Sequence, residues 1–343
     1  MTRFTLLALS VLTLAGVLAA EESISGPITG QWMIDPSPAA GKVQLTLHRS
    51  ADHSQMTSSS ALPLEQLRGL SRTQMDSPSG ATVHFEIARN AGTLRSDGYF
   101  RTGNGAGTFT FSPNASFVSD MRSLGYKDLT SETVFSMAVH DITVAYARDL
   151  RSLGADPGST DNLISLAIHQ VTIDYIRELK KLGFGELNAD HLVSMRIHDV
   201  TTEFVRDLKA MGYNPSADDL VSLRIHGATS EYVKQMKDLG FDPTLDQLVS
   251  MRIHGVGADF VRDLKGMGYK PSADDLVSLR IHGATSEYVK QVKNLGFSPT
   301  LDQLVAMRIH GVTPDYIQRL QARGIKNLTV DQLVNLRIHG IVE

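Results

Sequence analysis

The chain has 343 residues, 42% of them hydrophobic, and a formal net charge of −4. This is an ordinary globular composition with length for two domains, and it lacks the basic excess that favours a nucleic-acid partner. Because there is no cysteine, disulfides, thiolate metal sites and a catalytic thiol are excluded.

Residues 1–20 have the pattern of a signal peptide. Arg3 precedes an apolar run from Leu6 to Leu18, and Ala19-Ala20 offers small residues for cleavage before Glu21. The run is short for a membrane span, which needs about 20 residues, and no later run qualifies. We therefore expect an exported protein, periplasmic or extracellular, that does not span the membrane.

Residues 21–112 read as a β-domain. Val43, Leu45 and Leu47 alternate with polar residues, and the same alternation recurs at 83–87 and 109–111. Such a period of two is typical of half-buried strands. We expect about six antiparallel strands in a small sandwich or barrel-like sheet, with one short helix at 64–70. The expected core contains Trp32, Phe85, Phe109 and Phe111.

Residues 113–343 are an internal repeat. A histidine recurs at His140, His169, His198, His226, His254, His282, His310 and His339. A glycine recurs at Gly125, Gly154, Gly183, Gly212, Gly240, Gly268, Gly296 and Gly324, and every step in both series is 28 or 29 residues. Units of this length that each contain two short helices predict an α-solenoid of eight helix pairs, in which neighbouring pairs stack.

One repeat shows the helix signals. Thr229 is a good N-cap for a first helix that Gly240 ends. Thr244 with Gln247 forms a capping-box pattern for a second helix that runs to His254. Its apolar residues cover a wide arc, which predicts contact on two sides: Leu248, Val249, Met251 and Ile253.

A resemblance enters at the junction. Gly105-Ala106-Gly107-Thr108-Phe109-Thr110-Phe111 leads through Pro113-Asn114 to Leu124-Gly125-Tyr126, and units reading Leu-Arg-Ile-His-Gly-Val/Ala-Thr follow. This arrangement resembles the extracytoplasmic repeat region attached to some bacterial membrane metallopeptidases of the penicillin-sensor, antirepressor type. The resemblance covers about residues 26–343 and implies an interaction module of the bacterial envelope. The peptidase part is absent, since no His-Glu-x-x-His motif occurs, so no catalytic residue is carried over.

The histidine column admits two interpretations. A metal ladder is disfavoured, because equivalent residues of stacked helices lie about 10 Å apart, whereas metal–nitrogen bonds are about 2 Å long. We favour a structural role at the helix ends, where histidine can bond terminal carbonyls. The structural ladder then comprises His198, His226, His254, His282, His310 and His339.

An arginine column lies two residues before these histidines, on the apolar arc. A guanidinium there needs partners, and we expect carboxylates such as Asp219 or helix-end carbonyls. The alternative is a column of guanidinium groups that line a groove and bind carboxylate or phosphate there. The column comprises Arg196, Arg224, Arg252, Arg280, Arg308 and Arg337.

Two basic columns on the first helix of each pair form the candidate binding site. They lie three residues apart, so they share a helix face, and stacking would align them into a stripe. Acidic residues flank the stripe, so a plain solvated face is the competing interpretation. The stripe comprises Arg148, Arg177, Arg206, Lys234, Arg262 and Lys290, together with Arg151, Lys180, Lys209, Lys237, Lys265 and Lys293.

No catalytic motif assembles, and no cofactor is predicted. The first hypothesis is a non-enzymatic scaffold that binds a protein or an anionic envelope polymer through the repeats. The second is a ligand-binding or sensory role for the β-domain, with the solenoid as spacer or assembly surface. A hydrolase or metal protein using histidine and aspartate is the third.

Overall fold

A computed structural model describes residues 24, 27–51 and 54–341, so the predicted signal peptide at 1–20 lies outside the described residues. Two compact units are distinguished by their internal contacts. The first extends to Ala147 and includes 159–164, and the second comprises 148–158 and the chain from Ser165 onward. None of the helices in the described ranges has the length and apolar character required to cross a membrane.

The first unit contains a single six-stranded sheet with the order β3-β2-β1-β6-β5-β4, in which all neighbours are antiparallel. The predicted strand number and direction are confirmed, and the strands form one sheet rather than a sandwich of two. The strands are β1 Ile28–Pro36, β2 Lys42–Ala51, β3 Ser54–Pro63, β4 Ala81–Arg89, β5 Gly92–Arg101 and β6 Asn104–Pro113.

Trp32 lies at the centre of the buried face, where its ring is 5.0 Å from Phe85 and 5.6 Å from Phe100, between ring centroids. Its indole N–H donates to the carbonyls of Asp97 and Thr108 at 3.2 and 3.1 Å. The ring fits because Gly98 in β5 has no side chain there: a Cβ atom at that position would lie 2.4 Å from the indole.

Short helical segments of the same unit accompany the sheet. The residues predicted as a helix at 64–70 form a 3₁₀ turn, η1 Leu64–Gln66, and α1 Arg72–Met75 follows. Helix α3 (Ser131–Val139) inserts Phe135 against Phe109 and Phe111, at 5.5 and 5.3 Å between ring centroids. The predicted aromatic core is therefore confirmed, and it includes a residue of the first repeat.

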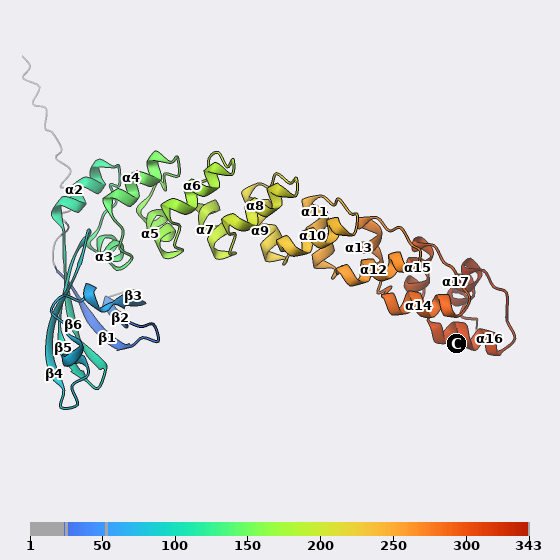
Figure 1. The fold of residues 1–343 in the computed structure, drawn as a ribbon, viewed down its shortest axis with the longest axis horizontal. Helices are drawn as coiled ribbons and strands as arrows, with labels where there is room; N and C mark the ends of the chain where they lie inside the picture. The colour runs from blue at the N-terminus through green and yellow to red at the C-terminus, as the bar shows by residue number, and fades with distance from the viewer. Residues whose placement is uncertain (1–23, 25–26, 52–53, 342–343) are drawn as a thin grey trace, which may run out of the picture. The chain divides into compact units, whose positions relative to one another are not determined.

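The described residues contain eight helix pairs, as the repeat predicted (Figure 1). The first helices are α2 Ala115–Ser123, α4 Val144–Ser152, α6 Ile173–Lys181, α8 Thr202–Ala210, α10 Ser230–Asp238, α12 Ala258–Gly266, α14 Ser286–Asn294 and α16 Pro314–Ala322. After α3, the second helices are α5 Thr160–Ile168, α7 Ala189–Ile197, α9 Ala217–Ile225, α11 Leu245–Ile253, α13 Ala273–Ile281, α15 Leu301–Ile309 and α17 Val330–Ile338.

The predicted caps set the helix ends. Thr229 accepts from the backbone N–H of Tyr232 at the start of α10, and Thr244 and Gln247 form the reciprocal capping box of α11. Gly240 follows α10 with a φ of +79°, a left-handed conformation that glycine adopts without strain.

In the second unit, first helices stack on first helices and second helices on second helices. Each second helix from α7 to α17 contacts the next second helix, and each first helix from α6 to α16 contacts the next first helix (Figure 1). The core between them is fully buried, as at Leu220, Leu223, Val233 and Met236. This arrangement is the stacked helical array that the repeat predicted.

The predicted contact on two sides is confirmed, since α11 contacts both α9 and α13. The predicted apolar arc is wrong at one residue: Leu248 and Met251 of α11 are fully buried, but Ile253 is 55% exposed. Leu248 and Met251 lie on the side of α11 that faces the core, whereas Ile253 points to the opposite side. No element in the described part of the chain covers that side.

Candidate functional site

The inner basic column, which begins at Arg151, joins repeats to one another. Lys265 donates to the carbonyl of Leu239, and Lys293 donates to that of Met267 at 2.6 Å, so each reaches the end of the preceding first helix. In the last repeat Gln321 makes the same bond, to Leu295 at 3.1 Å. Since a neutral amide substitutes for lysine there, the bond rather than the charge is what these positions share.

Earlier members of this column bond within their own repeat. Lys237 lies 2.7 Å from the carboxylate of Asp242, and its ammonium is 4.6 Å from the ring centroid of Tyr213 in the preceding repeat. The hydrogen bond with Asp242 raises the pKa of Lys237. The corresponding bonds are Arg151 to Asp156, Lys180 to the carbonyl of Gly185, and Lys209 to Asn214.

The outer basic column lies on open surface in every repeat. All six side chains are exposed: Arg148, Arg177, Arg206, Lys234, Arg262 and Lys290. Arg177 and Arg262 pair with Asp174 and Asp259 at 3.1 and 2.5 Å, and Arg206 approaches Glu178 at 4.0 Å. All members of the outer column are therefore accessible to a partner, and carboxylates accompany half of them.

The arginine column forms a ladder between repeats. Each guanidinium lies over an aromatic ring of the first helix in its own pair, at 4.8–5.4 Å from the ring centroid. Arg280 also donates through Nε to the carbonyl of His254 at 3.4 Å, and Arg196, Arg224 and Arg308 bond the equivalent carbonyls. Helix-end carbonyls, one of the two predicted partner types, therefore hold four of the six arginines, whereas the buried Nε of Arg252 has no hydrogen-bond partner among the described residues.

Carboxylates have a smaller part in this ladder than expected. Arg224 pairs with Asp199 at 2.6 Å, not with Asp219, whose carboxylate caps α9 by accepting from the backbone N–H of Ser216. No ion pair is recorded for the other five arginines within the described residues: Arg196, Arg252, Arg280, Arg308 and Arg337. Their charges are balanced by dipoles and aromatic faces instead.

The histidine column acts through its backbone. Each histidine from His198 to His339 is the C-cap residue of its second helix, and the carbonyls of His198, His254 and His282 accept from the arginine of the next repeat. His339 bonds the carbonyl of Asn335 through its ring at 2.9 Å. Within the described ranges, no group of three potential metal ligands is assembled.

Tyrosine adds a second bond across the same junction. Tyr175, Tyr232 and Tyr288 donate to the carbonyls of Val200, Val256 and Val312 in the following repeat at 2.7, 2.9 and 2.8 Å. Burial raises the pKa of each of these tyrosines to about 12, although the nearby arginine acts in the opposite direction.

A row of exposed isoleucines was not anticipated from the sequence. The last residue of each second helix from α5 to α17 is an isoleucine that is 48–55% exposed: Ile168, Ile197, Ile225, Ile253, Ile281, Ile309 and Ile338. In α7 to α17 a valine of intermediate exposure lies one turn earlier on the same face, as Val249 does before Ile253. We name this surface of α7–α17 the isoleucine face.

A signal for this row was present in the sequence. Leu248 and Met251 already fill the core-facing positions of α11, and Ile253 lies about 140° around the helix from Leu248. An isoleucine repeated so regularly at an outward position has no packing role within its own repeat.

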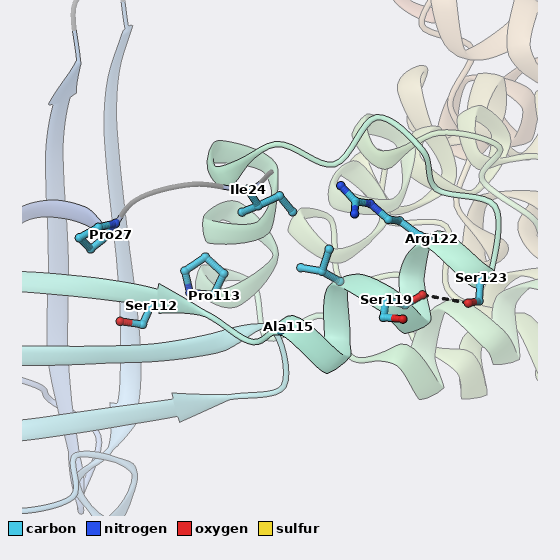
Figure 2. A pocket seen from close by; sticks show the side chains of 9 residues that line it. Ile24, Pro27, Ser112, Pro113, Ala115, Ser119, Arg122 and Ser123 are labelled. Carbon is cyan, nitrogen blue, oxygen red and sulfur yellow. Dashed lines mark hydrogen bonds between the residues drawn. The ribbon is translucent and has the colours of Figure 1, made fainter. Parts of the chain in front are cut away.

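The first unit contains an open cavity of about 820 Å³ (Figure 2). It is lined by Ile24, Pro27, the end of β6 at Ser112 and Pro113, and one side of α2 that includes Ser119, Arg122 and Ser123. A further space between the sheet and α3 measures only about 20 Å³. These described linings show no pairing of acid, base and nucleophile.

Comparison of the chain with protein families, curated proteins and solved structures found no match. Fold and surface therefore define its class: an antiparallel sheet unit followed by a stacked array of short helix pairs.

Proposed function

We propose that this protein is an exported, non-enzymatic interaction scaffold that docks a partner on its isoleucine face. The observation that carries the proposal is the row of half-exposed isoleucines repeated in seven second helices. Soluble monomers rarely expose contiguous apolar patches of this kind, and patches that do occur mark binding surfaces. Export is supported by the charged, apolar and small-residue pattern of residues 1–20.

The magnitude favours a binding role. Covering a side chain of this size completely stabilises by about 1.5–3 kcal/mol, so covering each half-exposed isoleucine contributes about 1 kcal/mol. Seven such contributions sum to about 7 kcal/mol, which lies within the range of about 4–15 kcal/mol that association costs, so the row can offset much of that cost. The repeat-to-repeat ladder below the face adds pre-organisation, because it holds each helix end in place before a partner arrives.

The outer basic column supports a second candidate, an anionic polymer or acidic protein bound along the first helices. Its six exposed cations favour this reading, because a periodic positive row attracts an extended anion. Exposed acids on the same helices, such as Glu203, Glu231 and Asp238, reduce the field of that row. The apolar row has no such opposition and is therefore the first choice.

A capture experiment separates the two surfaces. The bait is the chain from Glu21 onward, incubated with envelope extract, beside a variant with Ile225→Gln, Ile253→Gln and Ile281→Gln. A second variant carries Lys234→Gln, Arg262→Gln and Lys290→Gln, in the first helices of adjacent repeats. Helicity of each is first compared with the parent by circular dichroism.

We expect a partner that the parent retains and the isoleucine variant loses, with little effect of salt. Loss in the basic variant instead, with release by salt, would transfer the function to the outer column. Equal retention by all three would contradict both surfaces.

A further inference from the structure

The geometry points to a second binding site, in the first unit, that takes the C-terminal end of an amphipathic helix from a partner protein. The site is the cavity of about 820 Å³ beside α2 (Figure 2). The described residues that line it lie between Ile24 and Ser123, outside the isoleucine face, so the site is independent of the function proposed above.

First helices of the array receive the preceding first helix on one fixed side. Lys265, at the eighth position of α12, donates to the end carbonyl of Leu239 behind α10. Gln321 makes the equivalent bond from the eighth position of α16. The fifth position lies on this side too, since Arg206 of α8 approaches Glu178 of α6 at 4.0 Å. The first and fourth positions share this side of the helix, which we name the receiving side.

The cavity borders the receiving side of α2. Its lining residues on that helix occupy the first, fourth, fifth, eighth and ninth positions: Ala115, Val118, Ser119, Arg122 and Ser123. Within the described part of the chain, α2 has no first helix before it. The neighbouring α3 is covered, because Phe135 packs on the sheet. The row of first helices therefore ends at an open cavity, although the terminal units of such arrays need a cover.

The receiving side of α2 repeats that of α12, the helix that contacts α10 in the array. Two apolar positions are identical, and a basic residue stands three residues before the glycine that follows each helix. The matched pairs are Ala115 with Ala258, Val118 with Val261, and Arg122 with Lys265. Helix α2 thus keeps the residues that α12 presents on its receiving side.

The charge in the cavity sets the polarity of the occupant. Among the described residues that line it, Arg122 alone is charged. The end of a helix carries free carbonyls and about half a negative charge at its C-terminus, which a guanidinium attracts. The guanidinium has five N–H donors, so it can bind carbonyls or a carboxylate beside its other contacts. A single cation is too few for a polyanion such as a nucleic acid.

The size and the opposite wall of the cavity fit a short amphipathic helix. A helix about 10 Å across takes about 120 Å³ per residue, so the cavity has room for about seven residues, or two turns. Opposite α2, Ile24, Pro27 and Pro113 offer apolar surface (Figure 2). The occupant is therefore a helix with an apolar side, and its last turn lies at Arg122.

A copy of α10 serves as the probe, because α10 is the helix that contacts α12 in the array. The probe comprises residues 229–239 with fluorescein on the N-terminus, and a lactam between Lys234 and Asp238 holds it helical. These are the fifth and ninth positions, on the side away from α2. One form of the probe ends in a free carboxylate and the other in an amide. Fluorescence anisotropy measures binding to the purified chain from Glu21 onward.

We expect the parent to bind the acid form about three- to fivefold more tightly than the amide, because only the acid places a full charge beside Arg122. Arg122→Gln should weaken binding of the acid form and remove the difference between the two forms. Ser119→Trp, which fills the cavity from an exposed position, should weaken both forms by about tenfold. The matched control is Arg262→Gln, at an exposed position of α12, and it should bind both forms like the parent.

The inference is overturned if neither form binds at chain concentrations up to about 0.3 mM. It is also overturned if Arg122→Gln keeps the preference for the acid form, or if a scrambled peptide of the same composition binds equally well. The circular dichroism of each variant is first compared with that of the parent. The variant with Ile225→Gln, Ile253→Gln and Ile281→Gln should bind the probe like the parent, so failure of this site and failure of the isoleucine face are told apart.

Discussion

At the scale of single residues, the repeat junction is a small set of contacts used again and again. The guanidinium of Arg280 lies 5.3 Å from the ring centroid of Phe260 and donates to the carbonyl of His254. Its Nη2 also lies beside Gly255, where a Cβ atom would be only 3.1 Å away. Two features therefore favour glycine at this position: the close guanidinium and a φ of +68°.

Substitutions at Gly255 should depend on chemistry as well as size. We expect Gly255→Ala to reduce the free energy of unfolding by about 1–2 kcal/mol, because alanine is strained at this φ. Gly255→Asp should cost less, since Asp199 occupies the equivalent position at a φ of 53° and pairs with Arg224. Urea unfolding measures both; an aspartate variant less stable than the alanine variant would contradict the account.

The buried tyrosines predict a weakness at high pH. A tyrosine with a pKa near 10 when unfolded and about 12 when folded stabilises the protein fully below pH 10. That stability is lost as the pH rises from about 10 to 12, by up to about 1.4 kcal/mol per unit for each tyrosine, because the native state then holds more protons.

Urea unfolding at several alkaline pH values tests this prediction. Tyr175→Phe, Tyr232→Phe and Tyr288→Phe together should flatten the dependence on pH, at a cost of about 1 kcal/mol per lost hydrogen bond at neutral pH. Phe204 and Phe260 already occupy the equivalent position in other repeats, so the variant should fold. If the variant unfolds with the same pH dependence as the parent, the pKa of these hydroxyls is not raised in the folded state.

At the scale of elements, every helix of the array has nine residues, too short to be stable alone in water. Helix caps and packing against neighbouring helices must therefore supply the stability that so short a helix lacks. Thr285 caps α14 by accepting from the backbone N–H of Tyr288, whereas Gly257 at the start of α12 makes no side-chain cap.

This natural difference gives a matched pair of variants. We expect Thr285→Ala to lower the free energy of unfolding by about 1 kcal/mol, and Gly257→Thr to raise it by a few tenths. Thermal and urea unfolding of the two single variants would measure the changes. If neither variant changes the free energy of unfolding, the caps contribute little and packing between helices alone stabilises these helices.

The positions of the helices and strands were the part of this structure that the sequence predicted best. Thr229, Gly240 and the Thr244–Gln247 pair act locally, so their signals in the sequence survive in the structure. The alternation at Val43, Leu45 and Leu47 predicted a buried strand face for the same reason. Contacts between repeats were less accessible, since they depend on which side of each helix the neighbours occupy.

The candidate site shows that limit. Helical spacing placed Lys234 and Lys237 on one face, but it could not show that Lys237 turns to Asp242 and the Tyr213 ring while Lys234 stays exposed. The same spacing counted Ile253 as core, because periodicity alone does not tell a covered apolar side from an uncovered one.

At the scale of the whole molecule, the second unit is built by repetition, so its stability should scale with repeat number. Deleting residues 229–284 removes one two-repeat block and joins Ala228 to Thr285, as Ala284 is joined in the parent. We expect a folded protein with proportionally less helical signal and a smaller dependence of unfolding free energy on urea. Loss of cooperative unfolding would show that the repeats are not interchangeable.

The central claim is that the isoleucine face, and not the first helices, meets the partner. Its most direct test is a photo-crosslinking residue placed at Ile253 or, as a control, at Asp238, the exposed last residue of α10, in the protein produced in its native cells. We predict adducts to a partner protein from position 253 and few or none from position 238. Adducts from position 238 alone, or equally from both, would contradict the account.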